Sequence, residues 1–293
     1  MPNRIAVALA LAAATMAAGL AAAAALAAPD AGARLLADIS SPRNDYNFSP
    51  DAALRTAVFA RSDAEFANAK IMVTERRNGR WTEPRPISFS DDRWADSDPW
   101  LTPDGATLYF ISTRPTSGRE EGRADYDIWR AHRTSSGWSA PEHLGPSVNS
   151  RGQELGPETH GGTLYFSSAR RSGAGGLDIY AAPAEGTGFG EARLIDGPFN
   201  GPESDSDFTL SPDGATALFW RMVEGKGLLH ISRRGSAGWS TPEPLPPAIN
   251  HGPFNFTPAF APGGRSIWYA STREQPGQDA GLADIFVAAL PPR

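Results

Sequence analysis

Short apolar runs separated by turn residues recur along most of the chain, and they are too short to be helices. Residues 107–111, 163–166 and 266–269 hold β-branched and aromatic side chains, and Gly, Pro or Asp lies close to each run. Runs of this length and composition are typical of β-strands. The pattern therefore predicts an all-β protein.

These strands belong to a unit that repeats through the chain. A Pro-Asp-Gly type of turn follows the first strand of a unit, an Asp-Ile-aromatic segment forms the third strand, and a Gly-Trp-Ser type of segment begins the fourth. Repeats of about 40–50 residues made of short strands are typical of β-propellers. We expect a five-bladed β-propeller of four-stranded antiparallel blades. The turn marks are Asp51, Asp104, Gly161, Asp213 and Gly263, and the aromatic marks are Trp81, Trp138, Phe189 and Trp239.

The two ends of the chain predict how the ring closes. The last unit stops at 286–290, after its third strand, and it has no fourth strand. Residues 33–38 resemble 192–196, which is a fourth strand in the third unit. We therefore expect the N-terminal strand to complete the last blade, since closure protects the sheet edges. The blades are expected near 43–90, 91–149, 150–200, 201–250 and 251–290 plus 33–38, in a single domain over 28–293.

Residues 1–27 have the features of a signal peptide. Arg4 precedes an apolar run, and Ala25-Leu26-Ala27 fits the small-x-small cleavage rule. The run is long enough to span a bilayer if it is not cut. We expect cleavage after Ala27 and a periplasmic or secreted monomer with no membrane insertion.

Composition excludes several classes of site. The chain has no cysteine, so disulfides, thiolate catalysis, Cys-ligated zinc and a lipoprotein anchor are absent. Its net charge of −6 argues against nucleic-acid binding, which needs basic surfaces. The five histidines do not have zinc-site spacing, and no nucleotide-binding motif occurs. We expect no cofactor, with calcium as the one cation that the acidic residues below could hold.

A pair of charged positions changes together between the repeats. In three units an Arg ends the second strand and an Asp begins the third, whereas unit one has Asp63 and Lys70, and unit four has Val223 and Leu228. We therefore expect a structural ion pair across this hairpin. The predicted pairs are Arg114 with Asp127, Arg170 with Asp178, and Arg273 with Asp284.

The first strands of a propeller line the central channel, and acidic residues lie near the start of these strands. One aligned position holds Arg43, Asp96, Glu154, Asp205 and Asn255, and a second holds Asp45, Asp98, Gly156, Asp207 and Thr257. Crowded carboxylates raise one another's pKa unless a cation joins them. The six carboxylates therefore indicate a site for a divalent cation or for a Lys- or Arg-bearing partner. The alternative is structural, with each carboxylate capping backbone N–H groups at a blade junction.

The longest loop on the same face of the propeller lies between Arg114 and Asp127. Uneven loops on one face often carry binding residues. We name it a candidate contact loop, although a solvated excursion with no binding role would also explain it. Its candidate residues are Arg119, Glu120, Glu121, Arg123 and Tyr126.

At these motifs the chain resembles the TolB-type β-propeller repeat family, which is named for its Pro-Asp dipeptide. Matching segments are Thr102-Pro103-Asp104-Gly105, Gly176-Leu177-Asp178-Ile179-Tyr180 and the segment from Trp138 to Asn149. The resemblance covers nearly all of residues 28–293, and it implies a propeller that binds envelope proteins.

The leading hypothesis is an exported, non-enzymatic propeller that binds a protein or another cell-envelope component through its acidic, loop-rich channel face. One alternative is a glycoside hydrolase-like enzyme, because such enzymes use paired carboxylates as acid and as base or nucleophile. Its candidates are Asp98, Glu154 and Asp207. Another alternative is a scaffold stabilised by calcium in the channel.

Overall fold

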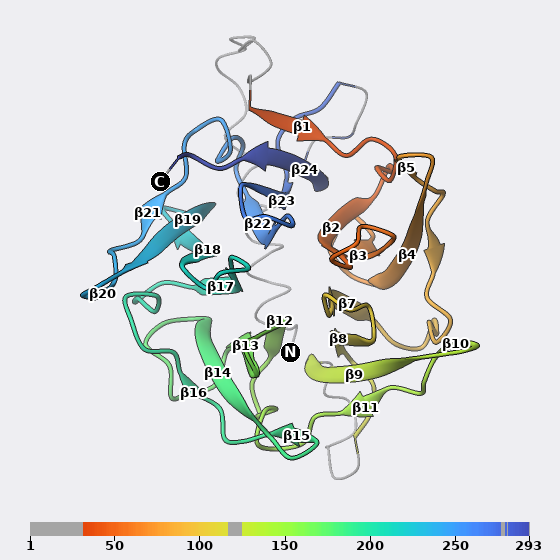
Figure 1. Cartoon of the computed structure of the whole chain (residues 1–293), viewed down its shortest axis with the longest axis horizontal. Coiled ribbons are helices and arrows are strands. Elements are labelled where there is room, and N and C mark those ends of the chain that lie inside the picture. The colour runs from red at the N-terminus through yellow and green to blue at the C-terminus, as the bar shows by residue number, and fades with distance from the viewer. Residues whose placement is uncertain (1–31, 117–124, 277–278, 280, 293) are drawn as a thin grey trace.

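The computed structural model describes residues 32–116, 125–276, 279 and 281–292, and the regular elements of these residues are all β-strands. The strands form five antiparallel sheets, each with a path of four strands, and the sheets are arranged as blades around a central axis (Figure 1). The predicted five-bladed β-propeller is therefore confirmed. No helix that could cross a membrane occurs among the described residues.

Each blade begins with its innermost strand and continues outward along the chain. The innermost strands are β2 (Asn44–Pro50), β7 (Asp96–Leu101), β12 (Glu154–His160), β17 (Asp205–Leu210) and β22 (Asn255–Phe260). The second strands are β3 (Thr56–Ser62), β8 (Thr107–Ser112), β13 (Thr163–Ser168), β18 (Thr216–Val223) and β23 (Ser266–Ser271). The third strands are β4 (Lys70–Arg77), β9 (Asp127–Thr134), β14 (Asp178–Glu185), β19 (Lys226–Gly235) and β24 (Asp284–Ala289).

The outer edge of the first four blades consists of two short segments that both pair with the third strand. In blades one, two and four a proline such as Pro141 lies between or within these segments, and proline, which cannot donate a ladder hydrogen bond, is well tolerated at such an edge. The segments are β5 (Arg80–Trp81) with β6 (Arg85–Pro86), β10 (Gly137–Trp138) with β11 (Glu142–His143), β15 (Gly188–Phe189) with β16 (Arg193–Leu194), and β20 (Gly238–Trp239) with β21 (Glu243–Pro244).

The N-terminal strand closes the ring, as the sequence predicts. Strand β1 (Ala33–Leu35) pairs with β24, and its register places Ala33 opposite Ala288. Figure 1 shows β1 at the outer edge of the last blade, from which the chain passes to β2 of the first. Ile39, on this connection, is buried in a cluster that includes Phe48 of the first blade and Trp268 of the last. The clasp therefore joins the two blades through backbone pairing and through a shared core.

Every innermost strand contains a β-bulge at an equivalent place. The pairing register shifts in all five, for example between Ser97 and Trp100 of β7. One residue of each bulge has a left-handed backbone, which non-glycine residues adopt rarely. We call these five residues the bulge ring: Asn47 (φ 55°), Asp98 (φ 47°), Gly156 (φ 55°), Asp207 (φ 55°) and Thr257 (φ 47°). Bulges re-aim side chains next to functional sites, and here they do so beside the channel.

Candidate functional site

Four of the six predicted mouth carboxylates are buried inside their blades, where each forms an ion pair with an arginine of the second strand or of the residues just after it. All four carboxylate side chains are fully buried. Burial raises the pKa of each of these carboxyls, and the arginine acts in the opposite direction. The pairs are Asp45 with Arg61, Asp96 with Arg114, Glu154 with Arg170, and Asp205 with Arg221.

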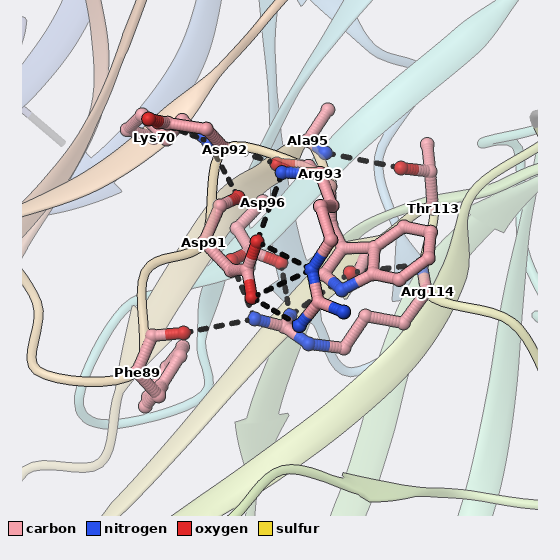
Figure 2. A network of polar contacts seen from close by, with 11 residues as sticks. Lys70, Phe89, Asp91, Asp92, Arg93, Ala95, Asp96, Thr113 and Arg114 are labelled. Carbon is pink, nitrogen blue, oxygen red and sulfur yellow. Dashed lines mark hydrogen bonds and ion pairs between the residues drawn. The ribbon is translucent and has the colours of Figure 1, made fainter.

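Figure 2 shows the pair of the second blade. Arg114 Nη2 donates to Asp96 Oδ2 at 3.0 Å and to the carbonyl oxygen of Phe89 at 3.1 Å. The guanidinium also lies over the Phe89 ring, 5.6 Å from its centroid. Arg114 therefore ties the first strand of its blade to the loop that enters the blade.

The same tie recurs in all five blades, and we call it the arginine clamp. Each clamp arginine donates to a carbonyl oxygen of the segment that leads into its blade. The donor and acceptor residues are Arg61 and Ile39, Arg114 and Phe89, Arg170 and Val148, Arg221 and Phe199, and Arg273 and Ile249. In the fifth blade Asn255 replaces the carboxylate, and Arg273 also donates to the Tyr269 hydroxyl. The clamp explains the four carboxylates by a structural role, although through arginine and not through backbone capping alone.

The predicted pairs of Arg114 with Asp127 and of Arg170 with Asp178 are wrong. In the second blade Ser112 lies opposite both Asp96 and Asp127, so an arginine two residues later can turn toward either strand. It turns inward to the buried carboxylate, and Asp127 Oδ2 lies within hydrogen-bonding distance, 2.9 Å, of His143 Nε2.

The other charged hairpin positions have separate partners as well. Lys70 of the first unit pairs with Asp92 at 3.3 Å, not with Asp63. In the fifth blade Asp284 accepts a hydrogen bond from Ser40, while Arg273 makes the clamp contacts described above. In the first three units, the change of both positions between repeats therefore did not identify a contact.

The alignment of the first unit was also wrong by two residues. Asp45 lies opposite Arg61, in the clamp position, and Asn47 occupies the bulge ring, so Arg43 belongs to neither set. The reason is the first turn, where Leu54 donates its N–H to the carbonyl of Asp51 as Gly105 does to Thr102. Leu54 has the left-handed backbone (φ 53°) that Gly105 has in the second unit. The Pro-Asp dipeptide of unit one thus precedes the turn instead of forming it.

Asp98 and Asp207 are the two mouth carboxylates that remain outside the clamps, and the bulge ring brings them to the channel. Asp98 Oδ2 accepts the N–H of Gly156 at 3.0 Å, and Asp207 Oδ2 accepts the N–H of Thr257 at 3.1 Å. A Cβ on Gly156 would lie 2.6 Å from Asp207 Oδ1, so both carboxylates flank this glycine. Each side chain therefore bridges two blades and still lines the channel.

These two carboxyls have unusually high pKa values. Burial raises the pKa of Asp98 to about 6 and that of Asp207 to about 7, and the charge of Asp98 contributes to the second shift. No arginine or lysine of the described part of the chain forms an ion pair with either one. Two close carboxyls with no basic partner favour a shared proton or a bound cation.

A cavity of about 370 Å³ opens above them on the loop-rich face. Asp98, Asp207 and Asn47 lie at its base, where they also line the narrow neck of the channel. Burial raises the pKa of Tyr46 and of Tyr126, and the charge of Asp98 adds to both shifts. The aromatic residues of the cavity are Tyr46, Phe66, Trp94, Tyr126, Trp220, Phe254 and Phe256.

The sequence prediction located this site in part. Asp98, Asp207 and Tyr126 were among the predicted site residues, whereas most of the other aromatic residues of the cavity were not. Arg119, Glu120, Glu121 and Arg123 of the candidate contact loop lie outside the described residues. Glu154, which the enzyme hypothesis names, is bound to Arg170 and does not line the cavity. The described residues contain no group of three or more metal-binding side chains, and calcium binding stays a prediction.

Comparison with known proteins gives the fold and not the family. No family model matches the chain, and no curated protein matches it. The structure is similar to the α-L-arabinofuranosidase from Lactobacillus brevis, with 12% identity, a TM-score of 0.56, and coverage of 87% of this chain and 92% of that one. An α-L-arabinofuranosidase from Podospora anserina, solved with cellotriose, gives 10% identity, a TM-score of 0.51, and coverage of 85% and 92%.

Part of a larger enzyme is similar as well. A puromycin-hydrolyzing peptidase of Mycobacterium tuberculosis matches 80% of this chain, with 14% identity and a TM-score of 0.45. This chain covers only 35% of that peptidase and 29% of a prolyl endopeptidase. At their low identities, the two arabinofuranosidases show a shared propeller architecture alone.

Proposed function

We propose that this chain is an exported, non-enzymatic β-propeller of the TolB-like type that binds a protein or another cell-envelope component at its loop-rich face. The observation that supports it is the aromatic-lined cavity whose base carries Asp98 and Asp207, neither of which forms an ion pair with an Arg or Lys of the described residues. The sequence predicts six binding carboxylates, but four of them are paired with arginines in the clamps. We therefore assign binding to the remaining two, Asp98 and Asp207.

The chemistry of the cavity favours a cationic group from the partner. An ammonium or guanidinium group would replace the missing countercharge and would donate hydrogen bonds to the two carboxylates. Aromatic side chains of the cavity such as Tyr126 and Trp220 add cation–π attraction to such a group. We infer that the partner inserts a Lys or Arg side chain, or a ligand group of the same charge.

The size of the cavity agrees with this occupant. Pockets that hold small ligands or single anchoring groups measure about 300–1,000 Å³, and this cavity lies at the lower end of that range. It accommodates one anchor of a partner whose remaining surface lies on the surrounding loops. Among the described lining residues, Asp92 and Glu65 add negative charge at the rim and Arg93 adds positive charge, while Asp92 also pairs with Lys70.

Photo-crosslinking in an envelope extract of the host tests this function. Glu65, which is exposed and lines the cavity, is replaced by p-benzoylphenylalanine. We expect discrete adducts that fall about tenfold or more when D98N and D207N are introduced together, because charge-assisted hydrogen bonds are lost. Yield is measured by gel shift and mass spectrometry.

A matched control places the same photoreactive residue at Glu185, an exposed position at the end of β14. Adducts formed there are expected not to respond to D98N and D207N. An identical adduct set from Glu65 with and without the two substitutions would contradict the role of the carboxylates.

One observation favours a glycoside hydrolase as the second candidate function. Two carboxyls, both with raised pKa values, line one aromatic cavity, and glycoside hydrolysis uses a pair of carboxyl groups as acid and as base or nucleophile. Hydrolysis of 4-nitrophenyl α-L-arabinofuranoside by the purified chain, abolished by D98N or D207N, would replace the binding proposal. If the chain does not hydrolyse this substrate, and crosslinks are lost in the D98N/D207N variant, the binding proposal is supported.

A further inference from the structure

A second cavity lies at the opposite end of the channel, on the face formed by the turns after the innermost strands. Its volume is about 340 Å³, and we call it the turn-face cavity. The neck between the two cavities holds only about 30 Å³, roughly the room of a single water molecule. Glu158 and Trp100 line both the neck and the turn-face cavity. A ligand in this cavity would therefore be separate from one on the loop-rich face.

Glu158 is a buried acid that the first site does not use. Its side chain belongs to β12, and the residue is 7% exposed. Oε1 accepts hydrogen bonds from Thr209 Oγ1 at 2.9 Å and from the N–H of Leu210 at 3.3 Å. Oε2 accepts none from the described residues, and Glu158 lines the cavity. One oxygen is thus fixed while the other remains available to a ligand.

The equivalent positions of the other blades show that a carboxylate is not needed for structure there. Ser49 bridges to the next blade with one oxygen, which accepts the N–H of Leu101 at 2.9 Å. Glu158 makes the same kind of bridge with Oε1 alone. Its counterparts are Ser49, Trp100, Thr209 and Ala259. The second oxygen of Glu158 therefore has no structural explanation.

The rest of the lining is mainly apolar and contains no Lys or Arg among the described residues. Asp51 and His160 are the other titratable groups, and Asp51 is engaged by the N–H of Arg55 at 2.8 Å. His160 is half-buried at the edge, near Gly214. The apolar lining includes Trp100, Leu101, Leu210, Phe260 and the prolines Pro50, Pro103, Pro212 and Pro262.

We propose that the turn-face cavity binds a small organic amine, with its ammonium group on Glu158 Oε2 and its apolar body against Trp100 and Phe260. Because Asp51 is engaged by backbone N–H groups, Glu158 is the acid of this apolar cavity with a free oxygen, and it selects an ammonium with a hydrocarbon body, since a neutral polar molecule would leave the ionised acid without a countercharge. A flat or aliphatic body of modest size fills the space between the proline-containing turns.

The protonation of Glu158 predicts that a proton is released when the amine binds. Burial raises the pKa of Glu158 to about 8, so the carboxyl is mostly protonated at pH 7 in the free protein. An ammonium favours the ionised carboxyl, so binding at pH 7 releases a proton from Glu158 to the buffer. The amine itself stays protonated, and the charge of the complex is balanced.

Calorimetry of the purified propeller with benzylammonium chloride tests the proposal. We expect one site and an observed enthalpy that differs between phosphate and Tris at pH 7, corresponding to release of close to one proton. E158Q is expected to lower affinity about tenfold or more and to remove the buffer dependence. Benzyl alcohol, which has no charge, is expected to bind about tenfold more weakly or not at all.

The D98N/D207N variant separates this site from the one on the loop-rich face. It is expected to keep both the affinity for benzylammonium and the released proton. Binding that survives E158Q but is lost in D98N/D207N would place the amine at the other cavity and overturn the proposal, as would absence of binding at 10 mM. Circular dichroism of E158Q confirms its fold; the amide retains an oxygen for Thr209 and Leu210, so the variant is expected to fold.

Discussion

Replacing Arg114 by alanine is expected to lower the free energy of unfolding by about 3–5 kcal/mol at pH 7, the cost typical of leaving one partner of a buried ion pair alone. The Asp96 side chain has no solvent exposure, so water cannot replace the guanidinium. The carbonyl of Phe89 loses a donor at the same time. The effect is expected to shrink at acidic pH, where Asp96 is protonated.

Guanidinium-induced unfolding, followed by tryptophan fluorescence, measures this difference. Arg93 is the matched control, because it belongs to the same network in Figure 2 but pairs with Asp91 at the surface. Its side chain is 73% exposed, compared with 11% for Arg114. R93A is expected to leave the unfolding midpoint unchanged, since exposed pairs are screened by solvent.

A second substitution shows whether the buried charge is the cause. D96N in the R114A background is expected to recover part of the lost stability, because it removes the unpaired charge. The fifth blade shows that an amide is tolerated at this position, since Asn255 replaces the carboxylate there, although that blade keeps its arginine, Arg273. Equal unfolding midpoints for R114A and R93A would contradict a stabilising role of the arginine clamp.

The local patterns were sufficient to predict the architecture. Turn residues, strand spacing and the missing last strand each depend on short segments, and β1 pairs with β24 as expected. The errors come from contacts that alternation along a strand does not specify. Ser112 has two cross-strand neighbours, so the position of Arg114 alone did not show which carboxylate it meets. Leu54 in a left-handed turn position hid the correct alignment of unit one.

Of the candidate site, the sequence predicted the two carboxylates and Tyr126, but not the rest of the cavity wall. Asp98 and Asp207 stand out from the repeat, but the cavity wall combines residues of several blades, such as Phe66 and Trp220. These residues are far apart in the sequence, so nothing in the sequence indicates that they lie close together in space. Glu158 was missed because its turn is degenerate. The available signal was an acid at a position where the other copies have Ser, Trp, Thr or Ala.

Glu158 is also expected to make the protein less stable as the pH rises. Burial raises its pKa from 4.5 to about 8, so between these values the folded chain holds a proton that the unfolded chain has released. Stability therefore falls as pH increases through this window, by about 1.4 kcal/mol per pH unit at most. The stability that the protonated Glu158 contributes to the folded state is fully present below about pH 4.5 and is lost by about pH 8. Asp98 and Asp207 act in the same direction, because their pKa values are also raised.

Unfolding free energies of the wild type and E158Q between pH 5 and 9 measure this effect. E158Q cannot ionise, so we expect a shallower decline and, at pH 8, a stability higher than that of the wild type by on the order of 3 kcal/mol. The conservative control E185Q, at an exposed end of β14, is expected to parallel the wild type. If E158Q and the wild type decline in parallel, then Glu158 ionises as easily in the folded chain as in the unfolded one. That result would exclude a raised pKa for Glu158, because a buried, protonated Glu158 must lose its proton at a higher pH in the folded chain than in the unfolded chain.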